Sequence, residues 1–114
     1  MEKIELYRTY IQQVLREYVG EGSSKNDNDE VETQLVFDTE RDHYQVVYAG
    51  WKNRYPMYGC VLHLDLKGDK IWIQHDGTEI GIANELVNLG VPKEDIVLAF
   101  HEPLVRKYTG FGVG

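Results

Sequence analysis

The side chains that could do chemistry are scattered along this chain of 114 residues and form no compact motif. The four histidines, His43, His63, His75 and His101, include no pair three or four residues apart, the spacing that places two metal ligands on one face of a helix. Cys60 is the only cysteine, which excludes an internal disulfide and a paired-cysteine zinc site. It alternates with leucines on a predicted strand, so we expect it in the core.

The pair His63 and Asp65 comes nearest to a reactive arrangement. The two residues are two positions apart on a predicted strand and share one face, where they could bind a metal or perform acid–base chemistry if a third group converged. A metal-dependent hydrolase centred here would use His75, but strand alternation places His75 on the opposite face. A cross-strand pair of His63 with Trp72 explains the same residues structurally. We therefore expect no catalytic residue, metal site or cofactor site.

Two further patterns lack what a ligand-binding loop requires. Residues 26–30 are acidic like a calcium loop, but the central glycine is absent and Val31 stands at a ligand position, so we expect an exposed connection. The glycine-rich tail, residues 110–114, follows no parallel-strand unit and opens no helix, unlike a dinucleotide-binding fingerprint. Neither segment indicates a cofactor.

Two small basic clusters could contact phosphate. Lys52 and Arg54 lie at a predicted hairpin tip, and Arg106 and Lys107 lie near the end of the chain. Exposed turns often have this composition. The net charge of −7, from 12 basic and 19 acidic residues, opposes a DNA backbone on average. We expect no stand-alone DNA binding, and a weak DNA-binding accessory module remains the alternative.

The periodicity of apolar residues predicts the elements that must position these side chains. A three-and-four spacing predicts an amphipathic helix over residues 2–19 that docks onto the following elements. A period of two then predicts strands at residues 33–38, 44–51, 58–66 and 70–75. A capping signal at Asp76 or Thr78 predicts a second helix from Gly77 that ends at Gly90. Residues 96–101 read as a strand buried on both faces or packed beneath a helix, and residues 104–108 as a last helical turn.

These elements predict an α+β fold: an N-terminal helix, an antiparallel four-stranded meander, a second helix, and a final short strand with a tail. We expect a single domain over residues 1–114. No apolar run is long enough to span a bilayer, and the N-terminus lacks the pattern of a secretory signal, so we expect a cytoplasmic protein with no membrane contact.

The third hairpin can be given a register from the pattern alone. Leucines at even positions of the third strand must share a face with Ile71 and Ile73. Pairing Leu64 with Ile71 and His63 with Trp72, around a two-residue turn at 67–68, meets this condition.

The face of the meander away from the helices is the predicted interaction surface. Two helices can cover only one face of a sheet in a domain of this size, and tryptophan and tyrosine are frequent anchors of protein interfaces. The candidate partner-binding residues are Trp51, His63, Trp72 and Gln74. They could serve homodimerisation or the docking of another protein. The alternative is that the helices or the C-terminal segment cover these rings.

Several long segments resemble the fdxN-element excision controlling factor (XisI) family. They are GW at residues 50–51, YGCVLHLDL at 58–66, IWIQHDGTE at 71–79, GVPKEDIVLAFH at 90–101 and YTGF at 108–111. The resemblance covers nearly the whole chain. Glu102 stands where the family often has a second proline, and the tail lacks the alanines with which family members often end.

The resemblance implies a controlling factor for site-specific excision of a DNA element during heterocyst development in cyanobacteria. It implies a nuclease-like companion, XisH, and a separate recombinase, and it assigns no catalytic residue. Our leading hypothesis is a non-enzymatic protein that binds a XisH-like partner, as an acidic antitoxin binds a nuclease, and reaches DNA only indirectly. The DNA-binding accessory module and the metal-dependent hydrolase remain the alternatives.

Overall fold

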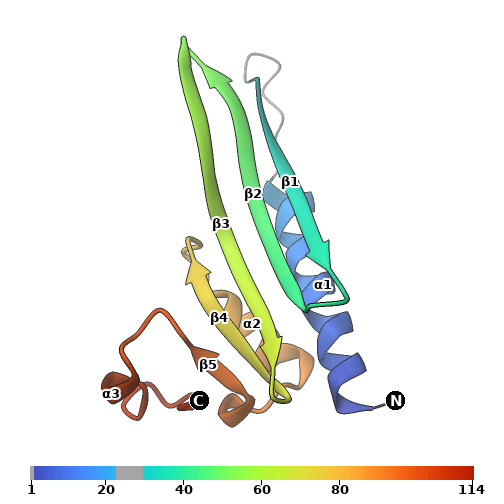
Figure 1. Ribbon diagram of the computed structural model, residues 1–114, viewed down its shortest axis with the longest axis vertical. Coiled ribbons are helices and arrows are strands. Elements are labelled where there is room, and N and C mark those ends of the chain that lie inside the picture. The colour runs from blue at the N-terminus through green and yellow to red at the C-terminus, as the bar shows by residue number, and fades with distance from the viewer. Residues whose placement is uncertain (1, 23–29) are drawn as a thin grey trace.

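A computed structural model describes residues 2–22 and 30–114. Five strands form one sheet in the order β1-β2-β3-β4-β5 (Figure 1). Their bounds are Glu30–Asp38, His43–Lys52, Tyr55–Lys67, Lys70–Asp76 and Ile96–Leu98. The first four strands are antiparallel neighbours, which confirms the predicted meander, and β5 joins β4 in parallel. The α+β class is confirmed, with a mixed sheet. Most of the expected connection at residues 26–30 lies outside the described residues.

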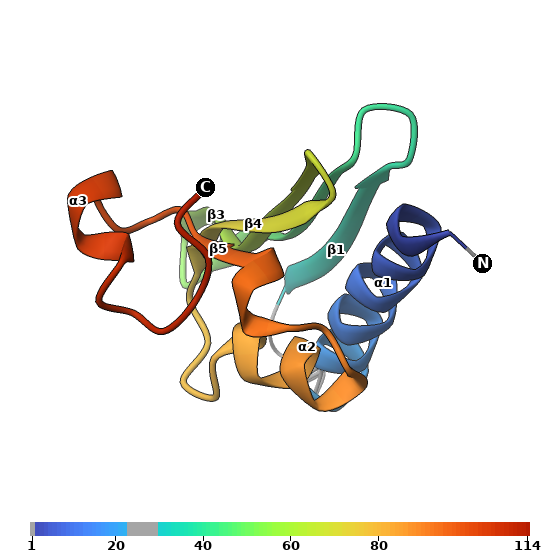
Figure 2. The same ribbon diagram turned by 90° about the horizontal axis from the view of Figure 1, so that it is seen from below.

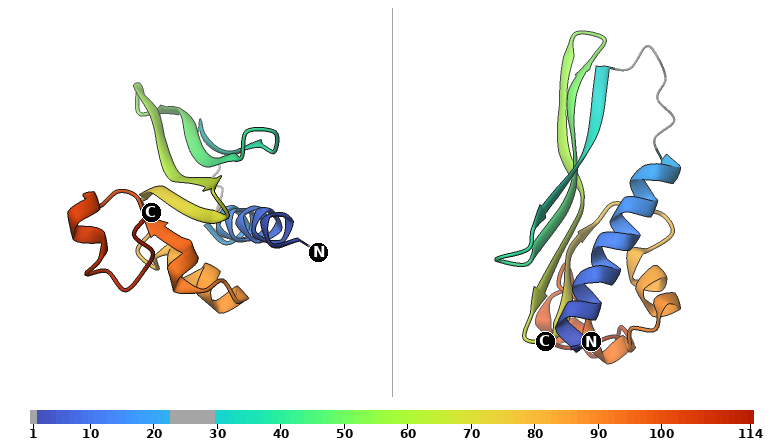
Figure 3. Two further views of the ribbon diagram at one scale, coloured as in Figure 1. Left: turned by 60° about the horizontal axis from the view of Figure 1, so that its bottom comes forward. Right: turned by 90° about the vertical axis from the view of Figure 1, so that its right-hand side faces the viewer.

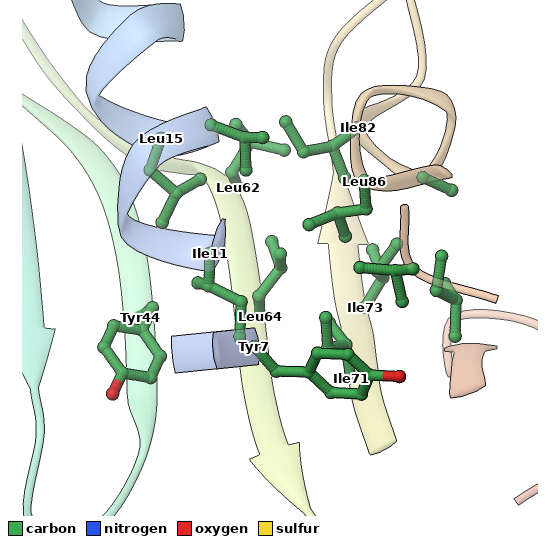
Figure 4. Close-up of a cluster of buried hydrophobic side chains, with 14 of the residues drawn as sticks. Tyr7, Ile11, Leu15, Tyr44, Leu62, Leu64, Ile71, Ile73, Ile82 and Leu86 are labelled. Atoms are coloured by element: carbon green, nitrogen blue, oxygen red, sulfur yellow. The ribbon is translucent and has the colours of Figure 1, made fainter. Parts of the chain in front are cut away.

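Two helices cover one face of this sheet. Helix α1 (Lys3–Gly22) and helix α2 (Ile82–Leu89) lie side by side beneath β1 to β4 (Figures 2 and 3). Ile11 and Leu15 of α1 point toward the leucines of β3, and Leu86 of α2 points toward the isoleucines of β4 (Figure 4). All these side chains are fully buried. Burial of this apolar layer is the main favourable contribution to the stability of the fold. It fixes the helices against one face of the sheet and leaves the other face uncovered by them.

The partly buried Asp42 and the buried Asp95 attach α1 at two separate points to turns that border the sheet. Arg8 forms a two-point ion pair with Asp42, at 2.8 and 3.1 Å, and the buried Tyr44 hydroxyl donates to the same carboxylate at 2.8 Å. Burial, followed by the hydrogen bond to Asp42, raises the pKa of Tyr44 to about 12. At the other point, Tyr7 donates to Asp95, and Lys3 pairs with that carboxylate at 2.7 Å.

Beyond the helices, β2 and β3 continue as a long arm, and β1 pairs with β2 along it as far as Trp51 (Figure 1). Its turn consists of Asn53 and Arg54, both with positive φ (49° and 72°), as a tight two-residue hairpin turn requires. Near the tip, Gly50 has a φ of 152°, and a Cβ there would lie 2.0 Å from the backbone oxygen of Glu30. Glycine at this position is what lets β1 pair closely with the arm.

The predicted start of the second helix is wrong. Helix α2 begins at Ile82, not at Gly77, after Gly81 with a φ of 83°. Asp76 nevertheless performs the capping chemistry, because its carboxylate accepts from the Thr78 N–H and, across the intervening loop, from the Ile82 N–H, each at 2.9 Å. The predicted end at Gly90 is confirmed, since this residue is left-handed and its N–H returns to the last turn of the helix.

The predicted register of the third hairpin is also wrong, by two residues. The turn residues are Gly68 and Asp69, both with positive φ, so Leu66 pairs with Ile71 and Leu64 with Ile73. A shift of two leaves the side chains of residues 64–67 and 70–73 on their expected faces, which is why the predicted core survives the error. Beyond Leu64 a bulge places His63 opposite His75 instead of Trp72.

The C-terminal segment packs on the far side of β5. The last strand is shorter than predicted, Ile96–Leu98, and helix α3 occupies Pro103–Arg106. The tail then returns, so that Gly112 forms a bridge with Val97 and donates to the Ile96 carbonyl at 2.7 Å. Both Ile96 and Val97 are fully buried, as expected of a strand covered on both faces.

Candidate functional site

Polar side chains gather on the sheet face that the helices do not cover. We call this the open face and define it by His43 and Gln45 of β2, Cys60, His63 and Asp65 of β3, and Gln74 of β4. Cross-strand pairing sets their neighbours, because His43 lies opposite Asp65 and Gln45 lies opposite His63. Residues that face each other across an antiparallel pair project to the same side of the sheet. The register, and not closeness in sequence, therefore assembles the group.

Asp65 is the centre of the group. Its Oδ1 lies 2.8 Å from His43 Nδ1 and 2.9 Å from His63 Nε2, and its Oδ2 accepts from Gln74 Nε2 at 3.3 Å. The Asp65 side chain is 16% exposed, whereas that of His43 is 54% exposed. The cluster is thus anchored in the sheet and accessible to solvent through the His43 ring. Two imidazoles and one carboxylate in contact can exchange protons or bind a cation.

The side of the cluster nearest the arm is formed by Gln45 and Cys60. Gln45 Nε2 lies 3.4 Å from His63 Nδ1 and 4.0 Å from Cys60 Sγ. The expectation of a core cysteine is wrong: a bulge at Val61 shifts the register, so that Cys60 pairs with Val47 on the open face. Burial raises the pKa of the Cys60 thiol, so this cysteine is not an activated nucleophile.

The candidate partner-binding residues fall into three environments. His63 and Gln74 belong to the Asp65 cluster. Trp72 lies between Lys67 and Arg106, whose charged groups are 4.8 and 5.6 Å from its ring, and its Nε1 donates to the Lys67 carbonyl at 3.1 Å. The C-terminal segment therefore packs against this ring, in agreement with the alternative that the sequence left open.

Trp51 lies far from the other three, near the tip of the arm. Its residue is 55% exposed, and the neighbouring Tyr55 and Tyr58 are 71% and 79% exposed. The tip of the arm lies at one end of the paired strands β2 and β3, and the Asp65 cluster lies at the other end (Figure 1). The arm thus carries exposed aromatic rings, the residue types that anchor protein interfaces.

The four basic candidates do not form one surface. Lys52 and Arg54 lie at the tip of the arm, and Arg106 and Lys107 lie at α3, at the opposite end of the molecule (Figure 1). Arg106 also donates to the carbonyls of His101 and Ala99, at 3.0 and 3.3 Å. Its guanidinium holds the C-terminal segment in place, which reduces the donors available for a phosphate.

Sequence reasoning missed His43, the third group that converges on His63 and Asp65. It considered His75 and placed it on the opposite face from His63, which is wrong, because the bulge beyond Leu64 makes the two histidines cross-strand partners. His75 is nevertheless not among the described residues whose ligand atoms converge on Asp65. The two-residue turn at 53–54 alone would pair His43 with Leu64, and only the bulge in β3, for which the sequence has no strong signal, brings His43 opposite Asp65.

None of the helices in the described ranges is long and apolar enough to span a bilayer.

The family model for XisI protein matches residues 1–113. A crystal structure of a XisI-like protein from Anabaena variabilis ATCC 29413 is 41% identical, covers 97% of this chain and 99% of its own, and superposes with a TM-score of 0.90. A second, described as fdxN element excision controlling factor XisI from the same organism, is 33% identical, with 99% and 100% coverage and a TM-score of 0.87. No curated protein matches the chain.

Proposed function

This chain belongs to the XisI protein family, and we propose that it is a non-enzymatic controlling factor for DNA-element excision that acts by binding a XisH-like, nuclease-type protein. The family match and the similarity to a relative described as an excision controlling factor support the role in excision. Coverage is nearly complete in both directions, so the comparison concerns the whole chain.

The exposed arm is the observation that carries the partner-binding part of the proposal. Trp51, Tyr55 and Tyr58 leave large apolar areas in water at the end of a protruding hairpin. Burying such rings against a partner is favourable in proportion to the apolar area removed from water, and an arm whose strands are already paired in the sheet loses little conformational freedom on binding. The arm therefore has the composition and the shape of a docking element.

Charge supports the same kind of partner. The chain carries a net charge of −7, and a protein that acts on DNA usually presents a basic surface. Opposite charges on the chain and on a basic partner would raise their association rate and disfavour the binding of acidic proteins in the partner's place. In this arrangement the chain reaches DNA only through its partner, and a homodimer through the open face remains an outcome to be distinguished by mass.

The experiment is co-expression with a XisH-like protein from the same genome, followed by measurement of the affinity of the purified pair. We expect Trp51→Ala to weaken binding by about tenfold or more, because a central aromatic anchor would be lost. Leu104→Ala is the matched control, since Leu104 is also exposed but lies on α3 at the other end of the molecule. Equal affinities for the two variants would contradict the arm as the docking element.

The DNA-binding accessory module is the weaker candidate. It needs Lys52, Arg54, Arg106 and Lys107 to contact one backbone, and the structure places these residues in two distant pairs. It predicts steeply salt-dependent binding to DNA by the chain alone. An electrophoretic mobility assay at low salt with no shift would remove it.

A further inference from the structure

We propose that His43, His63 and Asp65 form a binding site for a divalent transition-metal ion of the Zn²⁺ class. The three side chains offer one ligand atom each, and these atoms all lie within 4.8 Å of one another. Two imidazoles and one carboxylate are a set that binds zinc with a fourth position left open.

The distances fit a site that needs small movements to close. Zinc bonds to nitrogen and oxygen of about 2.0–2.2 Å place neighbouring tetrahedral ligand atoms roughly 3.3 Å apart. The His43–Asp65 and His63–Asp65 pairs, at 2.8 and 2.9 Å, are within about half an ångström of that value. The two imidazole nitrogens, which lie within 4.8 Å of each other, must come closer, and we assign this movement to His43 because its side chain is 54% exposed.

In His63 and Asp65, the atoms that would not bind the metal already have partners. The amide of Gln45 contacts Nδ1 of His63, and Gln74 contacts the second carboxylate oxygen of Asp65. Metal-binding histidines and carboxylates usually have such partners, which fix the orientation of the ring or carboxylate. The oxygen and nitrogen of a glutamine amide can exchange places, so Gln45 can accept the proton of Nδ1 while Nε2 faces the metal.

The charge of Asp65 supports a cation at this place. Asp42 and Asp95, the aspartates that bind α1, are also largely shielded from solvent. Each pairs with a permanent cation, Asp42 with Arg8 and Asp95 with Lys3. Within residues 2–22 and 30–114, the ion pairs of Asp65 involve two histidines and no lysine or arginine. A carboxylate in a low-dielectric setting gains much from a nearby positive charge, and a divalent cation would supply it.

The test uses the chain alone and is independent of any partner protein. After treatment with a chelator, the protein is titrated with Zn²⁺ by calorimetry and with Co²⁺ by visible absorption. We expect about one ion per chain, a higher melting temperature with Zn²⁺, and at least about a tenfold loss of affinity in His43→Ala. His75→Ala is the matched control, because His75 is an exposed histidine on the adjoining strand and lies outside the three ligands.

Asp65→Asn provides a second variant that keeps the size of the side chain, and circular dichroism checks that each variant is folded. Saturable binding by the parent and His75→Ala, together with loss in His43→Ala and Asp65→Asn, would support the site. The proposal is overturned if the parent binds no Zn²⁺ saturably, or if His43→Ala binds it as tightly as His75→Ala does.

Discussion

Asp95 offers a sharp test of how α1 is held to the sheet, because it is a buried carboxylate, 8% exposed, with two partners on one helix. The substitution Asp95→Asn keeps the shape of the side chain and removes its charge. Tyr7 can still donate to the amide oxygen, so the change isolates the charged part of the interaction. Packing of the apolar layer is left intact.

The expected cost follows from the kind of hydrogen bond that is lost. A hydrogen bond to a charged group contributes about 1.5–3 kcal/mol, and one between neutral groups about 0.5–1.5 kcal/mol. Tyr7 is buried, so its bond to Asp95 belongs to the stronger class in the parent and to the weaker class in the variant. The Lys3 side chain is 52% exposed, so solvent screens its charge and weakens its pair with Asp95. We therefore expect Asp95→Asn to lower the free energy of unfolding by about 1–2 kcal/mol at neutral pH.

The difference in unfolding free energy between the parent and Asp95→Asn should depend on pH. Burial alone would raise the pKa of Asp95, but the hydrogen bonds from Lys3 and Tyr7 lower it below its ordinary value overall. A carboxyl with a depressed pKa stabilises the fold fully above its unfolded pKa of about 3.9, and this contribution is lost as the pH falls through the folded pKa. The free energy of unfolding of the parent should therefore exceed that of Asp95→Asn by a constant amount from about pH 7 to 5. This difference should become smaller below about pH 4.

Urea unfolding followed by tryptophan fluorescence measures this gap at each pH. Glu94→Gln is the matched control, because Glu94 is the exposed acidic neighbour in the same short helical turn. A gap below about 0.5 kcal/mol at pH 7, the range of ordinary surface substitutions, would refute the reasoning. So would a gap that stays unchanged down to pH 3.

Substitutions at three further positions test other parts of the fold by urea unfolding. Leu86→Ala empties a fully buried position of α2 and should cost about 2–5 kcal/mol, and a cost below about 1 kcal/mol would show that α2 packs loosely. Asp76→Ala removes the acceptor of the Ile82 N–H and should cost about 1–2 kcal/mol, whereas Asp76→Asn should retain part of the stability. Gly50→Ala forces a Cβ against the Glu30 carbonyl and should cost about 1–3 kcal/mol, with faster amide exchange in β1 as the local sign. Unchanged exchange in β1 would argue against this close approach.

The elements and the core could be predicted from the sequence because they depend on periodicity. The spacing of Ile11 and Leu15 marks the buried stripe of α1, and alternation along β3 marks Leu62 and Leu64 as core residues. A register error of two residues in the third hairpin changed no face, so the apolar pattern could neither detect it nor be harmed by it.

The candidate site could not be predicted to the same extent, because it depends on bulges. An extra residue at Val61 turns Cys60 to the open face, and the same shift sets His43 opposite Asp65. Bulges have no strong signature in a single sequence. The prediction therefore assumed that side chains continue to alternate between the two faces of the sheet at these positions. The start of α2 was misplaced for a related reason: Asp76 is a capping residue in chemistry, but it acts across a loop of five residues.

We propose that this chain works by binding a protein partner, and light scattering on the chain co-purified with a XisH-like protein tests this most directly. We predict a stable complex whose mass is the sum of the two chains in a small whole-number ratio, formed at micromolar concentrations. Elution of the two proteins as separate species, each with the mass that it has alone, would contradict the account.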